Sequence, residues 1–151
     1  MLVYTGRARL ARNLLQNVLR AWYARAPDLV ATLAGLTTNA GACAEALRGG
    51  DLAAVGKSLS AYWRQKKCMA EGCEPDFVTE MLCALKDMLH GSSLAGAGGG
   101  GFMVLLTLEP DAKDAVRQRL VERGINTSPL GFHDVRLDPD GLVTTHEAAE
   151  E

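Results

Sequence analysis

Residues 92–106 read SSLAGAGGGGFMVLL, a glycine tract that runs directly into an apolar segment. Glycine reaches positive φ without a steric penalty and lets other groups approach the backbone closely, but it loses the most entropy on ordering. A flexible linker is one interpretation. However, both flanks are apolar, and a glycine loop before a buried strand presents main-chain N–H groups to an anion. We therefore interpret the tract as a functional loop that precedes a strand at 102–107. The apolar character of that strand predicts that it is buried on both faces or central in the sheet.

Composition limits the class of protein. The chain has 151 residues, 48% of them hydrophobic, and a net charge of −2. This length is sufficient for one domain with its own core. The near-neutral charge argues against nucleic acid as a partner, and no apolar run approaches the roughly 18–20 residues of a membrane span. Cys43, Cys68, Cys73 and Cys83 lack C-x-x-C spacing and a histidine pair, so we expect reduced cysteines, no metal site and a cytoplasmic location.

The N-terminal segment is basic, with no acidic residue before Asp28. This composition resembles that of a transit peptide, but we prefer a strand at 1–4 followed by a helix capped by Thr5. That helix begins near Gly6 or Arg7, and its apolar stripe is Leu10, Leu14, Val18 and Trp22. Arginines in its first turns oppose the helix dipole. The arginines concerned are Arg7, Arg9 and Arg12. They either hold an anion or pair with carboxylates elsewhere in the chain.

Further along the chain, the pattern predicts helices at 27–47, 51–67, 75–89 and 110–124, started by Pro or Asp and ended by Gly. The lysines at 66 and 67 are interpreted as compensating a helix dipole. Strands are expected near 132–137 and at 142–143, around a turn at 138–141. The prediction is an α+β domain over residues 1–145, with helices packed on a small, mainly antiparallel sheet, and a frayed acidic tail at 146–151.

Three segments together resemble the GHMP kinases, in particular their fucokinase and heptose-phosphate kinase branches. The glycine tract is similar to the third motif of that family. LVYTGRARLARNLLQNVLRAWYAR, residues 2–25, resembles the start of the family's C-terminal half. AYWRQKKCMAEGCEP, residues 61–75, resembles the middle of that half and is nearer to fucokinase. The three segments occur in the family's order, which is far more specific than a glycine run.

The resemblance implies ATP-dependent phosphoryl transfer with Mg²⁺ to a sugar hydroxyl, most specifically that of L-fucose at its anomeric position. It places a loop near the phosphates and the sugar, made of Gly96, Ala97, Gly98, Gly99, Gly100 and Gly101. It also implies cleft positions at Thr5, Gly6, Arg7, Trp63 and Lys67. It implies no catalytic base in this chain.

The family's nucleotide-binding motif and catalytic aspartate belong to its N-terminal half, and neither is present here. We therefore expect the C-terminal part of a kinase, inactive alone, with the N-terminal half as its partner. The alternatives are a heptose-phosphate kinase of the same family and a non-catalytic binding module that keeps the kinase fold.

Overall fold

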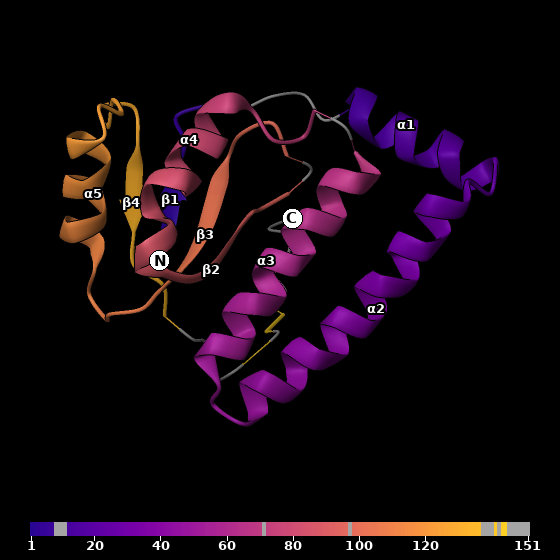
Figure 1. Cartoon of the computed structure of the whole chain (residues 1–151), viewed down its shortest axis with the longest axis horizontal. Helices are drawn as coiled ribbons and strands as arrows, with labels where there is room; N and C mark the ends of the chain where they lie inside the picture. Colours follow the sequence, from indigo (N-terminus) through magenta and orange to yellow (C-terminus); the bar gives the residue numbers. More distant parts are fainter. Residues whose placement is uncertain (8–11, 71, 97, 137–140, 142, 145–151) are drawn as a thin grey trace, which may run out of the picture.

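The computed structural model describes residues 1–7, 12–70, 72–96, 98–136, 141, 143 and 144, and within them it has an α+β architecture. The strands are β1 (Leu2–Tyr4), β2 (Leu89–Leu94), β3 (Phe102–Thr107) and β4 (Gly131–His133). They form one sheet in the order β2-β3-β1-β4, with every neighbouring pair antiparallel. The helices are α1 (Arg12–Tyr23), α2 (Pro27–Arg48), α3 (Leu52–Met69), α4 (Asp76–Leu85) and α5 (Lys113–Glu122), with a 3₁₀ turn η1 (Lys86–Met88). Figure 1 shows α3, α4 and α5 beside the sheet and the α1–α2 pair extending away from it.

One core lies between a face of the sheet and the helices. It joins strand residues such as Val3 and Met103 to helix residues such as Trp63, Met81 and Leu120. In β3 the burial alternates, because Met103 and Leu105 face this core while Phe102 remains 41% exposed. Of the two alternatives expected for this strand, the central position is confirmed, because β3 lies between β2 and β1, whereas full burial of both faces is not found. A strand in a sheet covered on one side alternates between core and surface even when all its residues are apolar.

Helix α3 lies directly against β2, backbone to backbone. A Cβ on Gly91 would collide with the carbonyl of Gly56, and a Cβ on Gly56 would collide with His90. Neither glycine has a positive φ, so both are needed here because of the close approach and not because of backbone conformation. On the side of α3 away from the sheet lies α2 (Figure 1), held in part by Asn39 Nδ2 donating to the Ser58 carbonyl at 2.9 Å.

Several predicted helix ends are confirmed. Pro27 starts α2, and its cap at Gly49 is followed by Gly50 with φ of +68°. Asp51 caps α3 by accepting a hydrogen bond from the Ala54 amide at 2.9 Å. After α5, Gly124 adopts φ of +74°, the left-handed conformation that ends helices.

Strand β2 was missed, because residues 75–89 were predicted as one helix followed directly by the loop. In the structure α4 ends at Leu85 and the chain forms β2 from Leu89. This strand contains two serines, a glycine and a histidine, so it lacks the β-branched and aromatic residues that mark strands in a sequence. Pairing with β3 and contact with α3 decide its conformation.

The expected start of the first helix is also wrong. Gly6 is in a bend with φ of +70° and Arg7 is irregular, while α1 begins at Arg12. Thr5 does not cap a helix; its hydroxyl donates to the Arg7 carbonyl at 3.3 Å and its side chain is buried. Leu19 and Trp22 of α1 are 54% and 38% exposed, and Leu47 near the end of α2 is 61% exposed.

Some expectations lie outside the described residues, or partly so. These are the Leu10 position, the 138–140 part of the turn and the acidic tail at 146–151. Of the expected strand at 142–143, the described Val143 is not in a strand.

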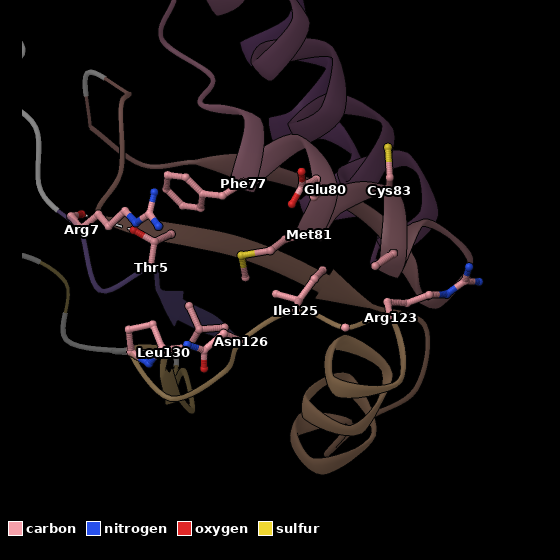
Figure 2. Close-up of a pocket in the computed structure, with 13 residues that line it drawn as sticks. Thr5, Arg7, Phe77, Glu80, Met81, Cys83, Arg123, Ile125, Asn126 and Leu130 are labelled. Carbon is pink, nitrogen blue, oxygen red and sulfur yellow. Dashed lines mark hydrogen bonds between the residues drawn. The ribbon is translucent and has the colours of Figure 1, made fainter.

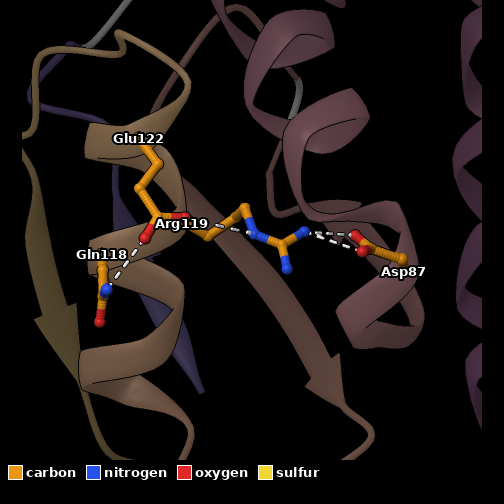
Figure 3. Close-up of polar contacts among 4 residues, drawn as sticks. All are labelled: Asp87, Gln118, Arg119 and Glu122. Carbon is orange, nitrogen blue, oxygen red and sulfur yellow. Dashed lines mark hydrogen bonds and ion pairs between the residues drawn. The ribbon is translucent and has the colours of Figure 1, made fainter.

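Helix α5 is fastened to η1 by an ion pair. Arg119 Nη1 donates to both carboxylate oxygens of Asp87 at 2.8 Å, and its Nε lies 3.9 Å from Glu122 (Figure 3). This contact joins the end of the α4 segment to the helix on the far side of the core. In the described part of the chain, no helix combines the length and apolar character needed to cross a membrane.

The α3–β2 contact predicts a large difference between two Gly→Ala substitutions. Gly91→Ala should lower the free energy of unfolding by about 1–3 kcal/mol, because α3 must move off the strand to admit a methyl group. Gly41→Ala is the control, since its Cβ would meet nothing within 4 Å on α2, and it should stabilise the protein by about 0.5–1 kcal/mol. Chemical denaturation measures both, and equal effects would contradict the close approach.

Candidate functional site

The glycine loop is joined to the end of β1 by main-chain hydrogen bonds. The Thr5 amide donates to the Gly101 carbonyl at 2.8 Å, and the Gly101 amide donates to the Arg7 carbonyl at 2.7 Å. At the base of the loop, the Ala95 amide donates to the Phe102 carbonyl at 2.7 Å. The predicted cleft residues Thr5, Gly6 and Arg7 and the glycine loop are therefore neighbours.

The loop requires glycine at particular positions. Gly98 and Gly100 have φ of +98° and +145°, which disfavour any residue with a side chain. A Cβ on Gly98 would lie 2.7 Å from the Cys73 carbonyl oxygen, and one on Gly100 would lie 2.5 Å from that of Arg7. The loop is therefore packed between the α3–α4 connection and the corner after β1, unlike a flexible linker.

Main-chain N–H groups of this loop are available for a ligand. The amide of Gly99 donates to the Cys73 carbonyl at 2.7 Å, whereas those of Gly98 and Gly100 donate to no group among the described residues. All three glycines are buried. Buried amides are usually paired, and successive main-chain N–H groups without a partner can bind an anion. Ala97 lies outside the described residues.

Glu74 organises the adjacent connection. Its carboxylate accepts hydrogen bonds from Trp63 Nε1 and from Thr79 Oγ1, the latter at 2.8 Å, and it lies 3.0 Å from Lys67 Nζ. Burial alone would raise the pKa of Glu74, but the donors from Thr79, Lys67 and Trp63 outweigh it and lower the pKa below the ordinary 4.5. Trp63 and Lys67 thus contact Glu74, which follows Cys73 in the chain.

Lys66 approaches the loop from the α3 side. Its ammonium donates to the carbonyl of Gly96 and lies 3.4 Å from that of Leu94. The residue is only 7% exposed. Lys66 therefore does not serve as the solvated dipole-compensating lysine expected from the sequence.

Two neighbouring clefts open beside the loop. One, of about 560 Å³, lies between α4 and residues 123–130, and the other, of about 770 Å³, reaches Gly99. Arg7, Phe77 and Glu80 line both clefts, and the Arg7 guanidinium lies 4.4 Å from the centre of the Phe77 ring. Figure 2 shows Met81 and Ile125 pointing toward one another within the first cleft, with Arg7 and Arg123 at opposite ends.

Sequence reasoning missed most of these partners. The roles of Glu74 and Lys66 depend on contacts between segments distant in sequence. One signal was present for Glu74, because it lies in the 61–75 segment that resembles the kinase family.

Comparison with known proteins assigns the class. Residues 43–126, more than half of the chain, match the family described as GHMP kinases C terminal. The chain therefore belongs to the C-terminal domain family of the GHMP kinases, which confirms the predicted family and its α+β fold.

Two curated relatives are more specific. The chain is 28% identical to the L-fucokinase/L-fucose-1-P guanylyltransferase of Bacteroides fragilis over 83% of its length. It is 32% identical to the bifunctional fucokinase/GDP-fucose pyrophosphorylase of Arabidopsis thaliana over 81% of its length. The chain spans only 13% and 12% of these two proteins.

A solved structure supports the fold alone. The mevalonate kinase of L. major, in complex with R-mevalonate, superposes with a TM-score of 0.71 at 20% identity. The match covers 80% of this chain and 37% of that protein.

The Glu74 hydrogen bonds predict a pH-dependent contribution to stability. Glu74→Gln should lower the free energy of unfolding at pH 7 by about 1.5–3 kcal/mol, because hydrogen bonds to a charged group are lost. Since the pKa of Glu74 is lowered on folding, this contribution is complete above about pH 4.5 and disappears as the pH falls through the folded pKa. The difference between wild type and Glu74→Gln should therefore shrink in acid. Glu109→Gln, at an exposed position, is the control, and a difference independent of pH would contradict the role of the charge.

Proposed function

We propose that this chain is the C-terminal part of an ATP-dependent sugar kinase that phosphorylates L-fucose at its anomeric hydroxyl. The observation that carries the proposal is the match, over more than four fifths of the chain, to two proteins named as fucokinases. Those names favour fucose over the heptose phosphate considered from the sequence. We also propose a cytoplasmic location for the protein.

The loop geometry suits a phosphate-bearing ligand. Phosphoryl transfer depends mainly on positioning and on stabilising negative charge. The buried amides of Gly98 and Gly100 and the adjacent Arg7 supply donors and positive charge at one place. In this proposal the glycine loop and the Thr5–Gly6–Arg7 corner form one wall of the active site. Trp63 and Lys67 hold Glu74, and MgATP, when bound, supplies the transferred phosphoryl group.

The proposed partners are the sugar, ATP and a remaining kinase half that carries the nucleotide-binding motif and the catalytic base. This agrees with the small share of each curated relative that the chain spans. Among the described residues there is no group of three or more His, Cys, Asp or Glu side chains placed to hold a metal ion. In this proposal Mg²⁺ enters bound to ATP.

The direct test is ADP release by the longest protein that the gene encodes, with Mg-ATP and L-fucose. We expect turnover with fucose that exceeds turnover with a heptose phosphate, and none from residues 1–151 alone. Preference for the heptose phosphate would overturn the assignment of L-fucose as the substrate. No turnover by a folded long protein would favour a binding module.

A substitution in the glycine loop tests whether this loop contributes to phosphoryl transfer. Gly100→Ala should reduce kcat by about 10²-fold, because small displacements of a positioning group have effects of this size, and a Cβ at this position meets the Arg7 carbonyl. Gly50→Ala makes the same change at φ of +68° with nothing within 4 Å, far from the loop. It should keep kcat within about twofold of wild type. Equal kcat values in folded variants would contradict a role for the loop.

A further inference from the structure

Lys66 is buried without a carboxylate to balance its charge. It is 7% exposed, and among the described residues it forms no ion pair. Its ammonium contacts main-chain oxygens of Gly96 and Leu94 and lies 5.6 Å and 5.4 Å from the ring centres of Tyr62 and Trp63. Carbonyl dipoles and aromatic faces stabilise a cation, but they leave its net charge in place.

The neighbouring lysine provides a contrast on the same helix. Lys67 is exposed and pairs with Glu74 at 3.0 Å. A lysine that only compensates a helix dipole can remain in solvent, as Lys67 largely does. Removing an ammonium from water costs free energy, so burial of Lys66 requires a compensating interaction, and the loop carbonyls provide it.

The carbonyls of Leu94 and Gly96 that Lys66 contacts lie where the chain enters the glycine loop. Leu94 ends β2, and Gly96 is the first glycine of the loop, so Lys66 holds the chain on both sides of Ala95. Since a peptide group is planar, fixing its carbonyl fixes the direction of the whole group. The other end of the loop is held separately, by Cys73 and Arg7. Lys66 therefore helps to fix the entry into the glycine loop, together with the hydrogen bond from the Ala95 amide to the Phe102 carbonyl.

Resting on the kinase function proposed above, we propose that Lys66 is a positioning residue that orients the start of the glycine loop and adds positive charge beneath it for the transferring phosphoryl group. The residue acts through the loop and does not contact the substrate. Its effect is therefore on the transition state more than on sugar binding.

The test compares three variants of the long protein in the ADP-release assay. Lys66→Met keeps the length of the side chain but removes its donors and charge, and should lower kcat at least tenfold while KM for the sugar stays within about twofold. Lys66→Arg restores a cation with donors and should recover part of kcat. Lys57→Met, at an exposed position on the same helix, is the matched control and should leave both constants unchanged.

Hydrogen exchange on the same proteins gives a readout that does not require activity. Lys66→Met should accelerate exchange in the segment 94–102 relative to wild type and Lys57→Met. If wild type has no sugar kinase activity but this acceleration is seen, the proposed function fails, while the inference that Lys66 orients the start of the loop is supported. Unchanged exchange together with unchanged kcat in Lys66→Met would overturn the inference, as would an equal loss of kcat in Lys66→Met and Lys66→Arg.

Discussion

The contact between the backbones of α3 and β2 at Gly56 and Gly91 is the constraint on which the rest of the structure depends. It places α3 closer to the sheet than any side chain would allow. From this position α3 directs Trp63 into the core and Lys66 under the glycine loop, and it supports α2 on its outer side. A pair of residues without side chains thus sets the geometry of the most chemically important helix.

The glycine loop also depends on close contacts that only glycine permits. Its amides and carbonyls are fastened at three points, by Arg7 after β1, by Cys73 before α4 and by Lys66 on α3. These three residues lie far apart in the sequence. The carbonyls of Arg7 and Cys73 lie so close to the loop that only glycine fits beside them, and Lys66 contributes a buried polar group. The entropy that glycine loses on ordering is offset by these hydrogen bonds. The result is a loop held at several points, in which the buried amides of Gly98 and Gly100 have no hydrogen-bond partner among the described residues.

Much of the candidate site could be located from sequence, because the glycine tract and the flanking family motifs are local patterns. Gly98, Gly100 and Arg7 do lie together. What could not be predicted is how the site is supported. Lys66 and Lys67 are adjacent and identical in type, yet one is buried under the loop and the other pairs with Glu74. Their difference arises from where α3 rests on the sheet.

The α+β class and most helix boundaries follow from the sequence, because proline, glycine, capping residues and helical periodicity act within a few residues of one another. The kinase family follows instead from the resemblance of three sequence segments to known kinases. Tertiary packing decides that 89–94 is a strand, that Phe102 of β3 is exposed while Met103 and Leu105 are buried, and that the apolar side chains Leu19 and Trp22 of α1 remain exposed. These outcomes depend on which surfaces meet in the folded protein. Residues such as His90, Gly91 and Ser92 have no strong local preference for a strand, so the sequence pattern does not predict one there.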